Sequence, residues 1–499
     1  MKLLSFSASN FKSIGADGGK IEILPVTVLV GENGAGKSSM LEALAFVAQR
    51  ARKTALGKYN LSGDYINYNS IDEITFRHER NKSIFFNFIF KLAKEDVQSL
   101  YQFIINSQPD DKDNFLANMR KLGISENEMS LATPDDLYDL YSSIKNTCRR
   151  IQIKCIMEVS IEVDGNTGIP LSLVVTGNQF LLWAYRKQPG GEFGVDLPGK
   201  TTRLYLDVGS DKIPVFGPIF DSQHRSYKVA GRIRGSTTTT GGPIRLPAPL
   251  DQVLDVLYTT ESWIISELGK IYYLRAPRGH LKSTVTAGAT GQIQDWVGNT
   301  SDDLGRFLTR IYGDPNLQKS ALPAIKQWAK EFGIDGMNAA SFGTNELNLD
   351  YNDDKLAVGL GMKGLGYGST QVLPIIAQGF ASEPESILAI EEPEISLHPN
   401  AQVRMLDMFA ELVKNRKSII FTTHSATMLM GLSRLVENGI QPEKIAVYEV
   451  EKSEAGSRYH RLQLNQNGFI QGWVRSYAEA EKHLLDSWLN SVPEEPDNP

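Results

Sequence analysis

The chain has 499 residues, 41% of them hydrophobic and 22% charged, and its 52 Lys and Arg against 58 Asp and Glu give a formal net charge of −6. This mildly acidic balance does not attract nucleic acid as a whole, so any DNA contact requires a local basic patch. The two cysteines are too few for a disulfide framework, and no apolar run approaches the roughly 20 residues of a membrane span. With no signal-peptide core at the N-terminus, these features exclude the secreted, membrane-spanning and disordered classes and predict a cytoplasmic globular protein.

The first ninety residues have mostly strand-like patterns. Residues 3–8 and 21–24 alternate in strand fashion, and the β-branched run at 26–30 is typical of a buried strand. Apolar residues at helical spacing predict a helix over 40–51, and two further strands are expected at 74–76 and 84–90.

The middle of the chain changes character twice. A polar stretch with helical periodicity runs from about 94 to 150, and strand-rich sequence follows from 151 to 229. A Thr- and Gly-rich loop is expected over 231–247. The later part predicts a strand at 271–274, helices at 300–311 and 319–332, alternating helices and strands over 361–451, further strands and a helix beyond them, and a disordered acidic tail.

A glycine-rich loop follows the strand at 26–30. Its sequence, GENGAGKS from Gly31 to Ser38, fits the P-loop pattern G-x-x-x-x-G-K-[ST] and lies between a strand and a helix, as that motif requires. Glycines let main-chain N–H groups turn toward phosphate oxygens, a lysine adds positive charge at the β- and γ-phosphates, and the following hydroxyl is suited to Mg²⁺. The predicted nucleotide-binding residues are Asn33, Gly34, Ala35, Gly36, Lys37, Ser38 and Ser39.

An acidic motif follows a second apolar strand, at 386–390. Glu391 and Glu392 come directly after it, where α/β sheets place their sites. We expect this strand to lie beside the P-loop strand, with Glu391 as a Mg²⁺ ligand together with Ser38, and Glu392 as the general base for the attacking water. An EEPE run without such a strand would be interpreted as the solvated start of a helix.

A third strand, at 418–423, ends in Thr423, His424 and Ser425. At this position His424 is expected to contact the γ-phosphate or its attacking water. His398, in the sequence Leu-His-Pro, has a weaker case and is also suited to capping a turn.

These motifs together resemble the ABC-type ATPases that include RecF, the SMC heads and the overcoming-lysogenisation-defect (OLD) family. The resemblance rests on Asn10 to Ser13, the P-loop, EEPE with LHP, and the Thr-His-Ser segment, and the last two forms are most similar to OLD-like ATPases. It implies an α/β fold, an ABC-type P-loop ATPase head with a mixed sheet, interrupted by a large α+β insertion. The expected parts are residues 1–90 and 271–491 for the head, 91–270 for the inserted region and 492–499 for the tail.

In this group two heads sandwich ATP and Mg²⁺, and a signature segment at a helix N-terminus reaches the partner's γ-phosphate. The resemblance places that segment at 364–371, before the apolar run 372–380, although the sequence departs from LSGGQ. The residues expected to act in trans are Gly368, Ser369 and Thr370, with Ser369 as the γ-phosphate contact.

The resemblance also implies a function. The sequence after His424 is too short for the Toprim nuclease domain of OLD nucleases, so the chain is similar to the ATPase subunits of anti-phage systems such as PARIS and Septu. It would form a homodimer of heads within a larger homo-oligomer, sense a phage protein or nucleic acid, and hold or activate a separate effector, expected to be a nuclease.

Two alternatives remain open. The first is a RecF-like ATPase acting on DNA in repair or recombination, for which Arg149, Arg150, Lys154, Arg232, Arg234 and Arg245 would supply a basic groove. The second is a scaffold protein in which bound ATP only stabilises the oligomer and is not hydrolysed. Glu392 argues against the scaffold, because a scaffold has no need for a base beside the Mg²⁺ ligand.

Overall fold

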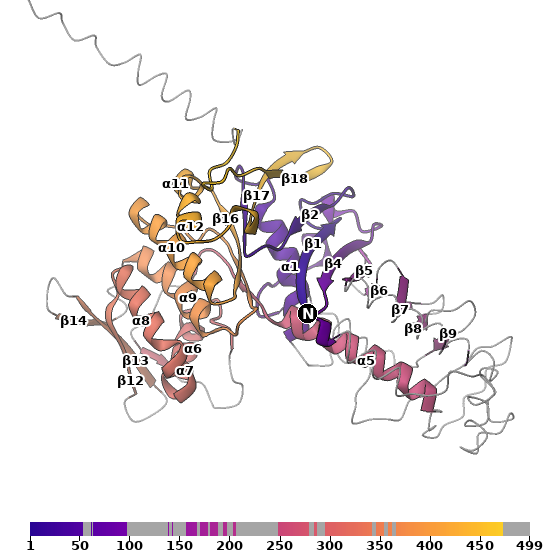
Figure 1. Cartoon of the computed structure of the whole chain (residues 1–499), viewed down its shortest axis with the longest axis horizontal. Helices are drawn as coiled ribbons and strands as arrows, with labels where there is room; N and C mark the ends of the chain where they lie inside the picture. The colour runs from indigo at the N-terminus through magenta and orange to yellow at the C-terminus, as the bar shows by residue number, and fades with distance from the viewer. Residues whose placement is uncertain are drawn as a thin grey trace, which may run out of the picture. The chain divides into compact units, whose positions relative to one another are not determined.

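A computed structural model describes residues 1–52, 61, 63–96, 138, 142, 156–166, 170–177, 180–187, 193–196, 203–205, 248–278, 284–286, 295–341, 346–353, 358–361 and 366–472. The chain forms two compact units (Figure 1): Met1–Glu22 with Glu42–Ile271, and Ile23–Leu41 with Tyr272–Pro499. Both cysteines, the six basic residues above, the loop 231–247, nearly all of the helical stretch expected at 94–150, and everything after residue 472 lie outside the described residues.

The first unit is built on an eight-stranded antiparallel sheet in the order β2-β1-β4-β5-β6-β7-β8-β9. Phenylalanines on β1 and β4 form its core, with the rings of Phe6 and Phe88 4.9 Å apart. The strands are β1 (Lys2–Ser9), β2 (Gly19–Glu22), β4 (Ile84–Lys91), β5 (Ile156–Val163), β6 (Pro170–Gly177), β7 (Phe180–Lys187), β8 (Phe193–Asp196) and β9 (Arg203–Tyr205). The helix α5 (Ala248–Gly269) follows them in the chain.

The sheet shows how the first compact unit continues past residue 90 to its end at Ile271. β4 pairs with β1 on one side, over residues 85–91, and along its whole length with β5 on the other. Main-chain hydrogen bonds therefore join the N-terminal strands to those after residue 155. The strand expected at 74–76 is wrong. The turns η1 (Ile71–Glu73) and η2 (Phe76–His78) flank Thr75. The Thr75 N–H donates a hydrogen bond to the nearby Ile71 carbonyl, so Thr75 forms only an isolated β-bridge with Phe11.

The second unit contains a six-stranded mixed sheet in the order β10-β15-β16-β3-β17-β18. β15, β16, β3 and β17 run parallel, and β18 returns antiparallel to β17. Every residue of β3, β15 and β16 is buried, as their apolar runs predict. The strands are β3 (Val26–Val30), β10 (Ile271–Leu274), β15 (Ile387–Ile390), β16 (Ser418–Thr423), β17 (Ile445–Ser453) and β18 (Gly456–Leu462).

This strand order corrects one expectation. β15, which carries the acidic motif, is not the neighbour of β3, because β16 lies between them and pairs with both. The sequence does not contain this order, since β3 precedes β16 by almost 400 positions and Thr27 nevertheless pairs with Ile420. The chain therefore assembles one sheet from two distant segments.

Helices and a small second sheet complete this unit. α10 packs on β16 and contacts α12, while α8 contacts α9 (Figure 1). The helix expected at 319–332 corresponds to α8, which begins three residues later, at Leu322, after the short α7 capped by Asp314. The helices are α1 (Lys37–Arg52, which continues into the first unit), α6 (Ser301–Gly313), α7 (Pro315–Ser320), α8 (Leu322–Glu331), α9 (Tyr367–Ala381), α10 (Pro399–Lys414), α11 (Ala426–Met430) and α12 (Ser433–Glu437). The small sheet contains β11 (Thr284–Thr286), β12 (Asp335–Ser341), β13 (Glu346–Asp353) and β14 (Val358–Gly361). Within the described residues no helix is long and apolar enough to cross a membrane.

Candidate active site

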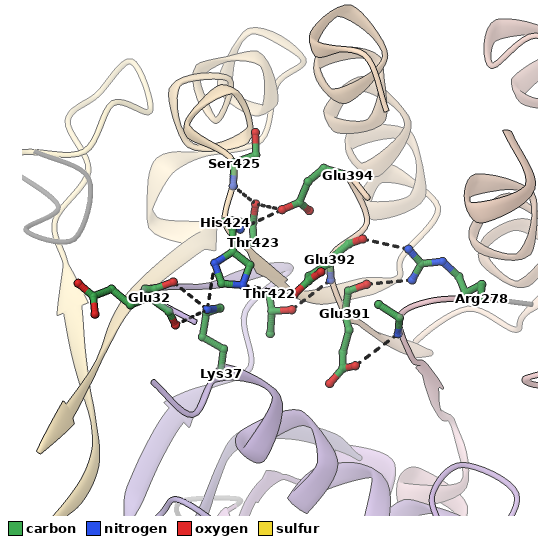
Figure 2. Close-up of polar contacts among 12 residues, drawn as sticks. Glu32, Lys37, Arg278, Glu391, Glu392, Glu394, Thr422, Thr423, His424 and Ser425 are labelled. Carbon is green, nitrogen blue, oxygen red and sulfur yellow. Dashed lines mark hydrogen bonds and ion pairs between the residues drawn. The ribbon is translucent and has the colours of Figure 1, made fainter. Parts of the chain in front are cut away.

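Three motifs meet at one edge of the six-stranded sheet. The P-loop follows β3, Glu391 and Glu392 follow β15, and His424 follows β16. Because these strands are parallel, their carboxyl ends lie at the same edge, and side chains from all three motifs face one another there (Figure 2). The structure thus brings together residues that are up to 387 positions apart in the chain.

The P-loop has the conformation that its glycines predict. Gly34 and Gly36 have φ of 75° and 111°, values that other residues rarely adopt. Gly31 is required for space as well, because a Cβ there would lie 2.3 Å from the carbonyl oxygen of Val450. Asn33 and Gly34 form an exposed tip, whereas Gly36 and Ser39 are buried.

The β17–β18 hairpin holds this loop from one side. The hydroxyl of Ser457 donates to the carbonyl of Ala35 at 2.6 Å, and the hydroxyl of Tyr459 donates to the carbonyl of Gly36 at 2.8 Å. Because both carbonyls accept hydrogen bonds from side chains of β18, the main-chain N–H groups of the loop can point to the opposite side. Sequence reasoning did not find these two residues, since only pairing in space links them to the P-loop.

Lys37 is buried at the first position of α1. Its Nζ donates to the carbonyls of Gly31 at 2.7 Å and Glu32 at 2.8 Å, and lies 3.3 Å from Nδ1 of His424. Burial lowers the pKa of Lys37 to about 8, although nearby glutamates, Glu392 foremost, raise it. Its ammonium therefore lies in a partly desolvated position where an incoming anion would be attracted strongly.

His424 connects Lys37 to Glu392. Its Nε2 lies 3.3 Å from Oε1 of Glu392. If the Lys37 ammonium donates to Nδ1, that nitrogen has to accept, so the proton is on Nε2 and is donated to Glu392. The hydrogen bond from His424 is the main reason that the pKa of Glu392 lies below its usual range.

Glu391 lies one residue earlier and is buried, with Oε2 accepting a hydrogen bond from the main-chain N–H of Ala276 at 3.3 Å. Ser38 is half-buried in the first turn of α1. A strand-end carboxylate and a helix-start hydroxyl are the oxygen ligands that Mg²⁺ accepts, with substrate phosphates and water completing its shell. The donor set therefore fits Mg²⁺.

Glu394 is a site residue for which sequence reasoning predicted no role. Its Oε1 accepts hydrogen bonds from the Thr423 hydroxyl at 2.5 Å and from the main-chain N–H of His424 at 2.9 Å, so it fixes the segment that carries the imidazole (Figure 2). Within the described part of the chain its Oε2 is buried without a hydrogen bond. Burial is the main cause of a raised pKa for Glu394, and the charge of Glu392 raises it further.

Glu394→Gln is expected to stabilise the protein increasingly as pH rises. A raised pKa means that the folded chain holds this proton better than the unfolded chain, so wild-type stability falls as pH rises from the ordinary carboxyl pKa of 4.5. The glutamine amide keeps the acceptor for Thr423 and His424 but has no charge to bury. Unfolding midpoints of Glu394→Gln and the wild type, measured from pH 4 to 8, check this. A difference between the two midpoints that does not change with pH would contradict the prediction. Glu383→Gln, at an exposed position, is the control.

The candidate signature segment begins α9, and residues 364 and 365 lie outside the described residues. Gly368 is needed because a Cβ there would lie 2.5 Å from the Ser396 carbonyl oxygen. The Ser369 hydroxyl donates to the carbonyl of Phe332 at 2.9 Å, and the buried Thr370 hydroxyl donates within the helix. For Ser369 to donate to a phosphate, as predicted, it has to leave Phe332.

His398 has the modest role that the sequence allowed. It is exposed at the N-cap of α10, and its Nδ1 accepts a hydrogen bond from the main-chain N–H of Asn400 at 3.3 Å. A side-chain acceptor at this position satisfies one of the unpaired N–H groups at the start of a helix. The structure thus gives His398 a capping contact.

A P-loop at the carboxyl edge of a mixed sheet, with an acidic strand end beside it, defines the α/β fold of a P-loop ATPase head. The chain belongs to the family described as AAA ATPase domain, which matches residues 1–162 and 293–429, more than half of its length. This confirms the resemblance to the OLD-like and RecF/SMC group of ATPases.

Individual proteins are more distantly similar. An OLD nuclease from Thermus scotoductus is 31% identical over 130 residues, which are 24% of each chain, so the match spans about a quarter of that relative. Among solved structures, the Smc head domain of Pyrococcus furiosus with an extended coiled coil is 11% identical, with 98% of this chain and 99% of that one covered and a TM-score of 0.41. For the SMC head domain from Thermotoga maritima the identity is 11%, the coverage 93% and 100%, and the TM-score 0.34.

Proposed function

We propose that this protein binds and hydrolyses ATP with Mg²⁺ at the edge formed by β3, β15 and β16. The observation that carries the proposal is the contact chain from Lys37 through His424 to Glu392. In it an ammonium, an imidazole and a carboxylate lie in one line of contacts.

Each group has a role that its surroundings support. The P-loop N–H groups and the positive end of α1 bind the phosphates, and Lys37 exchanges its carbonyl contacts for phosphate oxygens. Ser38 and Glu391 would hold Mg²⁺, which would neutralise negative charge on the nucleotide phosphates when bound. Glu392 accepts a proton from the attacking water, and His424 holds Glu392 in place and can reach the γ-phosphate.

The ABC-type mode, in which two heads share each nucleotide, is the second part of the proposal. It is supported by the position of α9, whose N-terminal turn precedes the acidic strand and includes the exposed Tyr367. A helix N-terminus is suited to an anion presented by a second copy of the chain. On this arrangement a head alone lacks part of its own site.

Mixing two inactive variants tests the shared site. Lys37→Ala disables the P-loop, and Ser369→Glu places a negative charge where the partner's phosphate would lie. In the mixed dimer one of the two sites keeps both intact halves, so mixing should restore roughly a quarter of wild-type ATP turnover at most. No recovery, with dimers present by light scattering, would mean that each head works alone.

We further propose that the ATPase controls a separate effector, expected to be a nuclease, in anti-phage defence. Support comes from the family membership, from the short match to an OLD nuclease, and from the acidic net charge, which does not favour DNA as the main partner. If a neighbouring gene encodes a nuclease, the co-expressed pair should form a complex whose nuclease activity changes with ATP and is insensitive to ATP in Lys37→Ala. Salt-sensitive DNA binding by this protein alone would instead favour the DNA-repair alternative.

A further inference from the structure

Arg278 is a buried cation behind the catalytic edge that the mechanism above does not use. The residue is only 4% exposed. Nη1 donates to the main-chain carbonyl of Glu391 at 2.8 Å and Nη2 to that of Glu392 at 3.0 Å (Figure 2). Nε donates to the main-chain carbonyl of Gln371 at 2.8 Å. One guanidinium thus joins the end of β15 to the first turn of α9.

The contact with Gln371 has a second component. The main-chain N–H of Arg278 donates to Oε1 of Gln371 at 2.6 Å, and Nε2 of Gln371 donates to the Arg278 carbonyl at 2.5 Å. The glutamine side chain, which is fully buried, therefore pairs with the Arg278 peptide as a neighbouring strand would. Residue 278 and α9 are held together by both main chain and side chain.

This arrangement is costly for a purely structural contact. Within the described part of the chain Arg278 forms no ion pair, and its three side-chain hydrogen bonds go to neutral main-chain carbonyls. Burial lowers the pKa of Arg278 to about 10, while the charges of Glu391, Glu394 and Glu392 act in the opposite direction. A well-packed apolar side chain would often stabilise such a place more. What a planar guanidinium adds is a fixed fork that can donate to two successive carbonyls at once.

Those carbonyls belong to the residues whose placement matters most. Glu392 has a φ of 40°, in the left-handed region that residues with a side chain rarely adopt. Its N–H donates to the Thr422 hydroxyl at 3.1 Å and its carbonyl accepts from Arg278. The two hydrogen bonds fix the peptide groups on both sides of Glu392, so its carboxylate leaves the main chain in a set direction toward His424.

We infer that Arg278 is a positioning residue for ATP hydrolysis. Its guanidinium holds Glu392 in the left-handed conformation that directs the carboxylate to the attacking water, and ties that conformation to α9 through Gln371. Movement of the first turn of α9 therefore reaches the base through a single side chain. This inference rests on the proposed function, because it requires Glu392 to act as the base.

The test compares Arg278→Lys, Arg278→Met and Arg275→Met in the full-length protein. Arg275 lies in the same segment but is exposed, so its variant is the matched control. For both Arg278 variants kcat should fall about 10- to 100-fold, as misplacement of a catalytic group by about 1 Å can cost, while the dissociation constant of ATP stays within about twofold. Lysine keeps the charge but cannot donate to two successive carbonyls in a fixed fork, so it should not rescue turnover.

Arg278→Lys in the Glu392→Gln background should give no further loss of kcat, because the group that Arg278 positions is already disabled. Wild-type kcat in Arg278→Lys would overturn the inference. So would a parallel loss of ATP binding and of the unfolding midpoint, which would indicate a structural role alone. If Arg278→Met does not fold, the lysine variant decides the question. A wild-type protein without ATP turnover would instead refute the proposed function.

Discussion

Glu392→Gln is expected to lower ATP turnover by a factor on the order of 10²–10⁴ and to leave ATP binding intact. Glutamine is almost the same size, so the hydrogen bonds of the Glu392 main chain to Thr422 and Arg278 are kept. What disappears is the acceptor for a proton from the attacking water. Single-turnover hydrolysis, together with equilibrium binding of ATP, separates the two effects.

The variant should also accumulate the ATP-bound oligomer, because nucleotide enters but is not consumed. Light scattering with MgATP should show a larger and longer-lived assembly than the wild type forms. Glu383→Gln removes an exposed carboxylate and should behave as wild type. Hydrolysis at the wild-type rate in Glu392→Gln would place the base elsewhere at this edge.

The sequence predicted the parts of this site whose chemistry is local. A P-loop needs its glycines, its lysine and its hydroxyl within eight consecutive residues, and a buried strand is indicated by a continuous apolar run, as at Ile387–Ile390. For this reason the P-loop, Glu391, Glu392 and His424 could be proposed as candidate site residues from the sequence alone. The α/β class follows from the same alternation of strands and helices.

Relations between distant segments are not readable in this way. Nothing in the sequence around β16 indicates that it lies between β3 and β15, since all three strands are equally apolar. Tyr459 and Arg278 act on main-chain carbonyls of other segments, and a carbonyl has no sequence signature. A buried polar contact of this kind becomes visible only when its partner is placed beside it.

Glu394 shows an intermediate case. It is visible as the last carboxylate of the EEPE run, but its partners, Thr423 and the main chain of His424, come from the end of β16 and the residue that follows it. Its raised pKa has the same origin, since burial by the surrounding segments is the main cause. A motif therefore indicates the residue, and only the fold indicates its role.

Lys37→Ala is expected to weaken ATP binding by a factor on the order of 10² or more, since truncating one member of a buried charge contact costs about 2–5 kcal/mol. The residue is 5% exposed and is the P-loop's own cation, so water cannot replace its ammonium easily. Titration calorimetry with ATP measures the loss. Lys452→Ala, an exposed lysine on β17, is the matched control and should bind as wild type does.

The same lysine predicts how ATP affinity depends on pH. Because the pKa of Lys37 is lowered to about 8, the ammonium loses its proton above that pH, and phosphate binding then has to recover it. Affinity should be level between pH 7 and 8 and fall by up to about tenfold per pH unit above, until the pKa of the ATP-bound form is reached. Binding measured from pH 7 to 10 in buffers of different ionisation enthalpy should show this proton uptake. An ATP affinity that stays unchanged up to pH 10 would mean that Lys37 is solvated in the same way as an ordinary surface lysine. The residual ATP binding of Lys37→Ala should not show the decrease in affinity above pH 8.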